Sequence, residues 1–468
     1  MNLPSPLVTI YIPSRNYGIY LSQAIESVIN QSYFSWELII IDEASEDNSL
    51  SIANSFKEMY PKKIKVISNK SPIGLQKIAN MVLGMANGKY MIRLDADDWF
   101  DESAIQLLVN KLELNENIGM AYGNYYYTDQ DGNVLDAEFR HRLGEEDKVG
   151  QLPPHGACTL FRVRALKSVG GYTESINAQD GWELWYKLLD RIGADNIQAP
   201  IFYYRQHTKS LSKDNSRLLK ARSKIFEKIA DKLEGDYQPK IVAVIPVKES
   251  YPGFEKVPFQ KIGNKTILEI VVNETSRSKK IDCIVISTES ERVLDFSKKL
   301  EENDMLPKHM RCKRKPQKAH GFPIREFLLE AGNEYYSKKG IYPDIMVYLS
   351  LHALQRNFDH IDSAINILRI TESDSIVSVL EERDPMFNYG ENGLELINPG
   401  RFQDLNFDRE RLYKFNGCLA AVWWEILKEN DLFGDKIAFL EMSKEDSVQV
   451  TSQSMVVEIN NKLLRDGE

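Results

Sequence analysis

The stretch YMIRLDADD, residues 90–98, decides the fold of the first half of the chain. It is a short apolar run that ends in the carboxylates Asp95, Asp97 and Asp98. Apolar runs of this length are typical of strands buried in a parallel sheet. Ligands bind at the carboxyl ends of such strands, which makes the acidic cluster a candidate binding site. Taken alone, the cluster could equally cap the next helix or lie solvated in a turn.

Apolar runs alternate with helical periodicity on either side of this stretch. The pattern predicts strands over 7–12, 36–41 and 64–68, helices over about 21–28, 47–59 and 74–86, and a C′ glycine at Gly88. Strand–helix alternation of this kind implies a mainly parallel sheet with helices on both faces.

The pattern restarts after a polar stretch at 232–239, which is typical of a linker. KIVAVIP at 240–246 echoes VTIYIP at 8–13, and further buried strands are expected at 283–288, 344–351 and 375–380. We therefore predict an α/β protein with two Rossmann-like nucleotide-binding domains in tandem, over residues 1–235 and 239–468.

Composition narrows the functional classes. The chain has 468 residues and a formal net charge of −9, which argues against a nucleic-acid partner because that would need a basic surface. Its four cysteines show no CxxC spacing, so neither a zinc site nor a disulfide framework is indicated. The sequence shows neither a signal peptide nor an apolar run of membrane-spanning length. We expect a cytoplasmic protein that attaches peripherally to the inner face of the membrane if its acceptor is lipid-linked.

Polar residues also follow the other expected strands, as Pro13-Ser14-Arg15 and as Asp42-Glu43. A pair of carboxylates spaced by one residue at a strand end can hold Mg²⁺ or Mn²⁺ through one or two ligands. Water and phosphate oxygens then complete the coordination. Such an ion would neutralise a leaving diphosphate.

Five stretches in the first half resemble the inverting family 2 glycosyltransferases of the GT-A fold. They are IPSRNYGIYLSQAIESVINQSY (12–33), ELIIIDEASEDNS (37–49), NKSPIGLQKIANMVLGMANGKYMIRLDADD (69–98), VGGYTE (169–174) and QDGWELW (179–185). Their order and spacing match the family across roughly residues 5–215. The resemblance implies transfer of a sugar from a nucleotide-diphosphate donor, with UDP as the default nucleotide, to a glycan or lipid-linked glycan acceptor.

The resemblance also implies roles for single residues. A nucleotide-sugar pocket would include Pro13, Ser14, Arg15, Asp42, Gly74, Asp95 and Asp97. Within it, Asp42 would contact the base and Asp97 would ligate the metal, with Asp95 on the ribose or diphosphate and as a second metal candidate. The family usually reads Asp-Asp-Gly-Ser where this chain has Asp42-Glu43-Ala44-Ser45, so the identity of the base stays open.

Asp180 stands where family members carry the catalytic base, which takes the proton from the acceptor hydroxyl. A second interpretation makes it a helix N-cap, with Glu183 completing a capping box. His207, in a YRxH stretch, is a candidate metal ligand or a structural hydrogen-bonding residue. His155 and the aperiodic region 124–156 are expected to form loops that shape the acceptor pocket.

The second half resembles the sugar-acid cytidylyltransferases, which make CMP-sialic acid and CMP-Kdo. The matching stretches are KIVAVIPVKE (240–249), KIGNKTILE (261–269), CIVISTESERV (283–293), YLSLHALQRNFDHIDSAINIL (348–368), FNGCLAAV (415–422) and EDSVQVTSQ (445–453). The phosphate loop at 247–253 has one glycine and an acidic residue, and Gln449 and Thr451 stand where the family has Mg²⁺-binding aspartates. The remaining candidates are Lys248, Arg356 and Asn416, and we expect a degenerate or repurposed domain.

The predicted function is a metal-dependent inverting glycosyltransferase with Asp180 as its base. One alternative is a bifunctional enzyme whose second domain also activates a sugar acid with CTP. Another is a non-catalytic scaffold in both halves. For the second domain alone, the options are a homodimer interface or a binding module for a sugar acid or nucleotide.

Overall fold

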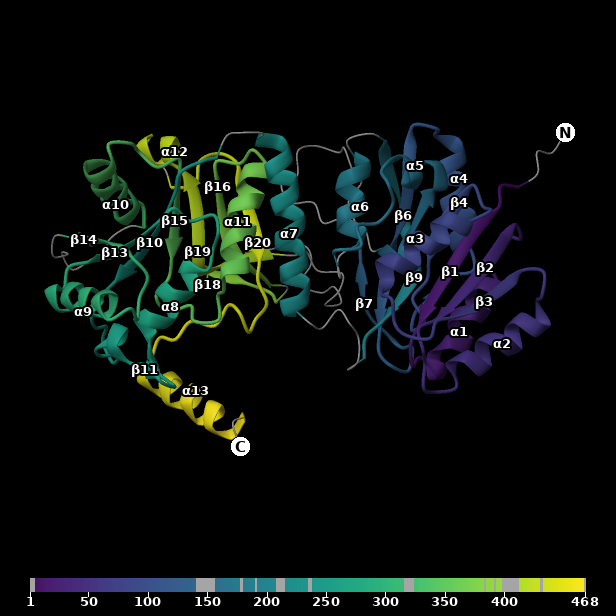
Figure 1. Cartoon of the computed structure of the whole chain (residues 1–468), viewed down its shortest axis with the longest axis horizontal. Helices are drawn as coiled ribbons and strands as arrows, with labels where there is room; N and C mark the ends of the chain where they lie inside the picture. Colours follow the sequence, from purple (N-terminus) through teal and green to yellow (C-terminus); the bar gives the residue numbers. More distant parts are fainter. Residues whose placement is uncertain are drawn as a thin grey trace. The chain divides into compact units, whose positions relative to one another are not determined.

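The computed structural model describes residues 5–139, 156–176, 180–189, 192–207, 215–234, 238–314, 324–382, 384–390, 393–397, 412–429 and 432–466. The chain divides into two compact units, Met1–Arg222 with Arg383–Glu410, and Ser223–Glu382 with Arg411–Glu468. The first division falls inside helix α7 (Asn215–Glu234). Figure 1 shows that each unit is built on its own sheet.

The first unit contains a nine-stranded sheet in the order β3-β2-β1-β4-β8-β6-β9-β5, with β7 paired to β6. Its strands are β1 (Val8–Ser14), β2 (Trp36–Asp42), β3 (Ile64–Ser68), β4 (Tyr90–Arg93), β5 (Trp99–Phe100), β6 (Ile118–Thr128), β7 (Val134–Glu138), β8 (Thr159–Arg162) and β9 (Gly193–Arg205). The strands from β3 to β4 are parallel, as expected. Beyond β4 the sheet is mixed, because β8 is antiparallel to both of its neighbours.

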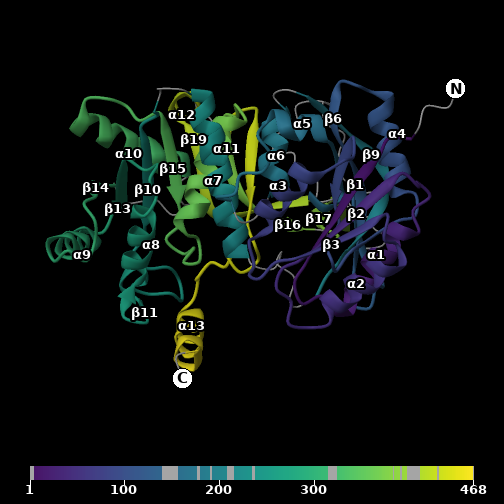
Figure 2. The same ribbon diagram turned by 45° about the vertical axis from the view of Figure 1, so that its right-hand side comes forward.

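Helices cover both faces of this sheet, which confirms the predicted α/β class. They are α1 (Gly18–Ile29), α2 (Ser49–Met59), α3 (Leu75–Met85), α4 (Ala104–Leu114), α5 (Val163–Ser168) and α6 (Asp180–Leu189). Alternate residues of β1 feed two cores, with Ile10 packed in the core of α1 and α4 and Tyr11 in the core of α3, α5 and α6. In Figure 2, α1 and α2 lie on one side of β1 and β2, and α3 lies on the other.

Two expectations about the first unit are wrong in detail. Helix α3 ends with Ala86 as its C-cap, so Gly88 does not close it. A Cβ at Gly88 would lie 2.6 Å from the backbone nitrogen of Thr9, so the glycine is needed where β1 and the start of β4 approach closely. In the region expected as loops, β6 runs on to Thr128 and forms a hairpin with β7. His155 lies outside the described residues.

The second unit contains a seven-stranded sheet in the order β14-β13-β10-β15-β19-β16-β20. Its strands are β10 (Ile241–Val247), β13 (Cys283–Thr288), β14 (Met310–Lys313), β15 (Ile345–Leu349), β16 (Ser375–Glu382), β19 (Leu412–Trp423) and β20 (Ile437–Glu441). The strands from β14 to β15 are parallel, and β19 is antiparallel to β15 and β16. The expected second α/β domain is therefore confirmed.

The other elements of the chain are short strands and covering helices. They are β11 (Lys261–Ile262), β12 (Lys265–Thr266), β17 (Phe387–Gly390), β18 (Gly393–Leu396), α8 (Ile267–Ser276), α9 (Glu291–Glu302), α10 (Ile324–Lys339), α11 (Phe358–Ile370), α12 (Trp424–Lys428) and α13 (Gln453–Asp466). Among the described residues, the helices are all too short or too polar to cross a membrane.

Candidate active site

The carboxyl ends of three adjacent parallel strands form one edge of the first sheet. Strand β1 ends at Ser14 and β2 at Asp42, and these two residues are paired in register. On the other side of β1, β4 leads directly into Asp95. Ser14 is buried, Pro13 is half-buried and Arg15 is exposed. The fold thus brings the predicted nucleotide-binding residues to a common edge.

The loops that follow β1 and β2 hold each other in place. Asn16 adopts the left-handed conformation, with φ at 58°, and its side-chain oxygen accepts a hydrogen bond from the backbone N–H of Glu46 at 2.7 Å. The backbone N–H of Gly18 donates to Asp47 at 2.9 Å. A Cβ at Gly18 would lie 1.9 Å from the side-chain oxygen of Asn48, so a larger residue here would displace that side chain. These contacts hold the loops after β1 and β2 in a fixed arrangement at the edge of the sheet.

Asp42 lies at this edge with 2% of its surface exposed. Its Oδ2 atom accepts long hydrogen bonds from the backbone N–H of Ser45 at 3.3 Å and from Ser68 Oγ at 3.4 Å. Its buried Oδ1 atom has no partner among the described residues. Ala44 adopts a φ of 58°, so it keeps the backbone conformation of the glycine that the family resemblance places here.

Glu43, where the chain departs from the family pattern, has a structural role that the sequence did not reveal. Its Oε2 atom accepts from the backbone N–H groups of Ile73 at 2.8 Å and Gly74 at 3.0 Å. Its Oε1 atom accepts from Asn69 Nδ2 at 2.5 Å. Gly74 has a φ of 90° and is the N-cap of α3. Glu43 thus anchors the segment that leads into α3, and it occupies the N–H group of Gly74.

The acidic loop after β4 is only partly exposed. Asp95 forms an ion pair with Arg93, whose Nε lies 3.0 Å from Asp95 Oδ1. Asp98 is buried, and its Oδ1 atom accepts from the backbone N–H of Arg205 at 2.8 Å. Burial raises the pKa of Asp98 well above its usual value, and the neighbouring charges of Asp97 and Asp95 raise it further. Its Oδ2 atom has no partner among the described residues.

His207 and Asp97 meet although 110 positions separate them in the sequence. The imidazole Nε2 lies 2.9 Å from Asp97 Oδ2, and both side chains are largely buried. The rings of Tyr17 and Tyr20 flank His207, with centroids 5.9 and 5.4 Å away. Burial raises the pKa of Tyr17, and the charge of Asp97 raises it further, so its hydroxyl stays protonated as a hydrogen-bond donor to Asp97.

Arg205 joins the acidic loop to the surrounding elements, and the sequence did not single it out. It donates from Nε to Asp97 O at 2.8 Å, from Nη1 to Gln130 O at 2.6 Å and from Nη2 to Gln23 Oε1 at 2.5 Å. Its guanidinium also lies over the rings of Tyr20 and Trp99. The only sequence signal for this role is its position in the YRxH stretch.

The donor atoms at this edge suit a hard divalent ion. Asp95 and Asp97 offer carboxylate oxygens and His207 offers an imidazole nitrogen. In the described ranges, no group of three or more His, Cys, Asp or Glu side chains is placed so that it could hold a metal ion. This arrangement fits an ion that one or two carboxylates hold and that phosphate oxygens complete.

Asp180 is the first residue of α6, and the structure describes its backbone only. The turn before α6 is firmly anchored. The Oε1 atom of Glu183 accepts a hydrogen bond from the Thr173 hydroxyl. The same atom forms an ion pair with Lys187 Nζ at 2.5 Å. Asn80 of α3 bonds both the N–H and the carbonyl of Tyr172, at 2.8 and 2.9 Å. The carboxylate of Glu183 is therefore already bonded to Thr173 of the VGGYTE motif, and this contact joins the motif to α6.

The three candidates in the second unit have different environments. Lys248 is exposed after β10, with its Nζ 5.3 Å from the ring centroid of Tyr251. Arg356 is buried, donates from Nη1 to Ser350 O at 3.1 Å and to Cys418 O at 2.9 Å, and has its pKa lowered to about 10 by burial. Asn416 accepts from Ser378 Oγ at 2.5 Å. Arg356 and Asn416 thus stabilise the local backbone.

Two of the departures from the cytidylyltransferase pattern are built into the second unit. Glu249, the acidic residue of the phosphate loop, accepts from Ser290 Oγ at 2.6 Å and pairs with Arg292 at 3.1 Å. Gln449 donates to the backbone oxygen of Asn416, and its Nε2 would lie 2.6 Å from a Cβ at position 417. Both side chains are tied to the protein itself.

Comparisons with known proteins agree with both expected resemblances. Residues 9–170 match the family model for glycosyl transferase family 2. Residues 243–310 match the family model for cytidylyltransferase. Each match falls within one of the two structural units. The first unit is therefore similar to family 2 glycosyltransferases over residues 9–170, and the second is similar to cytidylyltransferases over residues 243–310.

Curated glycosyltransferases are similar to part of this chain. A chondroitin synthase of Escherichia coli is 26% identical over 183 residues, which are 39% of this chain and 26% of that protein. An uncharacterized glycosyltransferase of Haemophilus influenzae is 39% identical over 120 residues, 26% of this chain and 36% of that protein. Glycosyltransferase GlyG of Streptococcus pneumoniae is 32% identical over 130 residues, 28% of this chain and 42% of that protein. The chain thus spans less than half the length of each.

Two solved structures are also similar. Staphylococcus aureus TarS residues 1–349, in complex with UDP-GlcNAc, has 16% identity and a TM-score of 0.41, over 48% of this chain and 66% of that chain. Mannosyltransferase PcManGT from Pyrobaculum calidifontis, in complex with GDP-Man and Mn²⁺, has 16% identity and a TM-score of 0.39, over 48% of this chain and 64% of that chain.

Proposed function

We propose that the first unit is a metal-dependent inverting glycosyltransferase. It moves a sugar from a nucleotide-diphosphate donor to a glycan or lipid-linked glycan acceptor. The observation that carries this proposal is the meeting of Asp97 and His207, 2.9 Å apart, beside Asp95 at the carboxyl edge of a parallel sheet. The family 2 match over residues 9–170 supports it independently.

The nucleotide lies across the carboxyl ends of β1 and β2. Asp42 is suited to recognise the base, because its buried Oδ1 atom has no partner in the described part of the chain and can accept a hydrogen bond from a base N–H. Ser14 and the exposed Arg15 line the same edge. A base with a ring N–H that faces Asp42, as in uracil, fits this acceptor, and UDP is the default donor nucleotide.

The diphosphate lies at the acidic loop. Asp97 and Asp95 would hold Mg²⁺ or Mn²⁺, and His207 would be a third ligand or orient Asp97. When bound, the ion would neutralise the charge of the departing diphosphate. Arg205 fixes the backbone of Asp97, and Tyr17 donates to its carboxylate, so the loop is held in shape before the donor arrives.

Asp180 is the proposed base on the acceptor side. The contacts of Glu183 with Thr173 and of Asn80 with Tyr172 join α6 to the segment before it, which supports a defined place for this residue. In the inverting reaction, the acceptor oxygen forms a bond to the anomeric carbon while the bond to the diphosphate breaks. The hydroxyl proton passes to the carboxylate of Asp180.

For the second unit we propose a degenerate cytidylyltransferase domain that lacks CTP chemistry. The contacts of Glu249 and Gln449 support this, because both side chains fill positions that a phosphate or a metal would need. Its role is then a homodimer interface or a binding module, and we keep the proposed boundary between residues 235 and 239. Titration of the full chain with CTP and Mg²⁺ tests it, and micromolar binding with pyrophosphate release would show the bifunctional alternative instead.

A donor screen tests the transferase proposal. The full chain is incubated with Mn²⁺ and a panel of UDP-, GDP-, dTDP- and CMP-sugars, and released nucleotide is measured. We expect slow hydrolysis of one nucleotide-diphosphate sugar, which EDTA abolishes and added Mn²⁺ restores. Asp97→Asn is expected to abolish it as well. Glu116→Gln, an exposed carboxylate after α4, is the matched control. Hydrolysis or binding of none of these donors would favour the scaffold alternative.

We also propose that the chain acts in the cytoplasm, with peripheral attachment to the inner face of the membrane when the acceptor is lipid-linked.

A further inference from the structure

A basic cavity lies at the edge of the first sheet opposite the acidic loop. It has a volume of about 310 Å³ and is lined by Gly88, Lys89, Arg162, Val163, Arg164 and Lys167. Tyr90, the first residue of β4, is paired with Arg162, the last residue of the antiparallel strand β8. Asp95 follows the other end of β4, so the cavity is separate from the proposed donor site.

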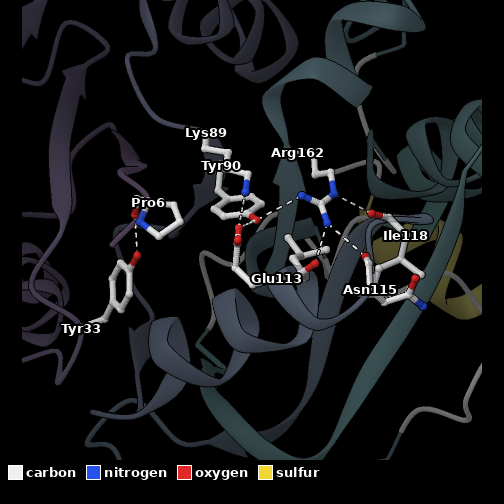
Figure 3. Close-up of polar contacts among 9 residues, drawn as sticks. Pro6, Tyr33, Lys89, Tyr90, Glu113, Asn115, Ile118 and Arg162 are labelled. Atoms are coloured by element: carbon white, nitrogen blue, oxygen red, sulfur yellow. Dashed lines mark hydrogen bonds and ion pairs between the residues drawn. The ribbon is translucent and has the colours of Figure 1, made fainter. Parts of the chain in front are cut away.

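Arg162 forms the rigid wall of this cavity and is 2% exposed. It donates to Ile118 O at 2.7 Å, Leu112 O at 2.5 Å, Asn115 O at 3.1 Å and Tyr90 Oη at 3.1 Å (Figure 3). These four acceptors are neutral, so within the described residues no carboxylate pairs with the guanidinium directly. Glu113, which accepts from Tyr90, acts on the Arg162 charge at longer range. A buried charge that is hydrogen-bonded but not paired stabilises an anion placed next to it.

The other cations differ in how far they are neutralised. Lys89 pairs with Glu113 at 2.5 Å, and Tyr90 also donates to this carboxylate (Figure 3). Arg164 and Lys167 are exposed, and neither has an ion-pair or hydrogen-bond partner within the described residues. They are three positions apart on α5 and therefore share one face of the helix. Among the described residues, no acidic side chain lines the cavity, in a chain whose net charge is −9.

We propose that this cavity binds a phosphate or diphosphate group. Arg and Lys side chains that converge on a concave surface are the usual ligands of phosphate oxygens. Its volume is at the lower end of ligand pockets, which suits a phosphorylated head group better than a whole nucleotide sugar. A soluble phosphate ester and an anionic lipid head group share this chemistry. The site goes beyond the proposed transferase function and does not depend on it.

Calorimetric titration of the full chain with pyrophosphate tests the proposal. EDTA is present throughout, so that no metal ion can hold pyrophosphate at the donor site. We expect binding by the wild type and by Asp97→Asn, and affinity at least tenfold weaker in the double variant Arg164→Gln/Lys167→Gln. Both replaced side chains are exposed, so the fold is expected to survive. The double variant Lys57→Gln/Lys62→Gln removes two exposed lysines elsewhere and is the matched control.

A second arm distinguishes the sources of the phosphate. Sedimentation with phosphatidylcholine vesicles, with and without phosphatidic acid, is compared for the wild type and the pocket variant. Binding that needs both phosphatidic acid and the pocket residues identifies a lipid head group, and pyrophosphate binding alone identifies a soluble ester. The proposal is overturned if the pocket variant binds both probes as tightly as the wild type, or if the wild type binds neither. Loss of pyrophosphate binding in Asp97→Asn would also refute it, since that binding would then belong to the donor site.

Discussion

Replacing Arg205 by methionine removes the guanidinium that holds the acidic loop and keeps most of the apolar stem. In the native protein this group donates to Asp97 O, Gln130 O and Gln23 Oε1, at 2.8, 2.6 and 2.5 Å. Each of these charge-assisted hydrogen bonds contributes about 1.5 kcal/mol at the low end of the usual range. The contacts with two aromatic rings add about 0.5 kcal/mol each.

These contributions share one side chain and are not additive, so we expect the first unit to lose about 3–5 kcal/mol of its free energy of unfolding. For a unit of about 250 residues this lowers the melting temperature by about 10 °C. The loop is also released, so we expect the variant to bind Mn²⁺ more weakly. Arg205→Lys keeps the charge but not the planar guanidinium. Its melting temperature and Mn²⁺ affinity are expected to lie between those of the wild type and Arg205→Met.

Differential scanning calorimetry of the full chain measures the stability change, and titration with Mn²⁺ measures the effect on the loop. Lys57→Met, which removes an exposed cation of the same unit, is the control and should melt as the wild type does. A shift of less than about 2 °C in Arg205→Met, with unchanged Mn²⁺ affinity, would refute the idea that this residue holds the loop.

Three further changes have distinct expected outcomes. Asp180→Asn should lower the transfer rate by about 100-fold or more while nucleotide affinity stays unchanged, because the amide cannot take the acceptor proton; wild-type turnover would exclude this base. Gly88→Ala should cost about 2 kcal/mol or more in denaturant unfolding, because its Cβ would meet backbone atoms of β1 and β4; an unchanged midpoint would contradict this. Burial raises the pKa of Asp362 to about 6, so the folded second unit holds a proton that the unfolded chain releases near pH 4. Stability should therefore fall by up to about 3 kcal/mol as the pH rises from about 4 to about 6, and Asp362→Asn should unfold without that slope.

Most of the fold could be predicted from hydrophobic periodicity. Strands β3 and β13 have the predicted bounds, and α2 begins and ends within two residues of the helix predicted over 47–59. Periodicity works for these elements because each buries a regular set of side chains. It failed for the β6–β7 hairpin, where the aromatic run Tyr125, Tyr126 and Tyr127 does not alternate with polar residues. Periodicity does not encode strand direction, so it could not predict that β8 is antiparallel to β4 and β6.

The site was predictable only where a motif marks it. Asp95 and Asp97 follow an apolar strand, and the sequence singles them out. Glu43 and Arg205 do not stand out, because their contacts reach segments far away in the sequence: Glu43 bonds Gly74, and Arg205 bonds Gln23. Such pairings follow from the arrangement of strands in the sheet. In the second unit, Gln449 could be noted as a lost aspartate, but its bond to the backbone of Asn416 could not.

The contact between Asp97 and His207 also bears on the order of folding. It closes a loop of 110 residues, and Arg205 closes one of similar length to Asp98. Contacts so distant in the chain form late, after the local strand–helix units have collapsed. During synthesis, β1 to β4 and their helices leave the ribosome well before β9 does. We therefore expect the nascent sheet to be largely built while the acidic loop is still open, and metal affinity to be acquired only when β9 docks.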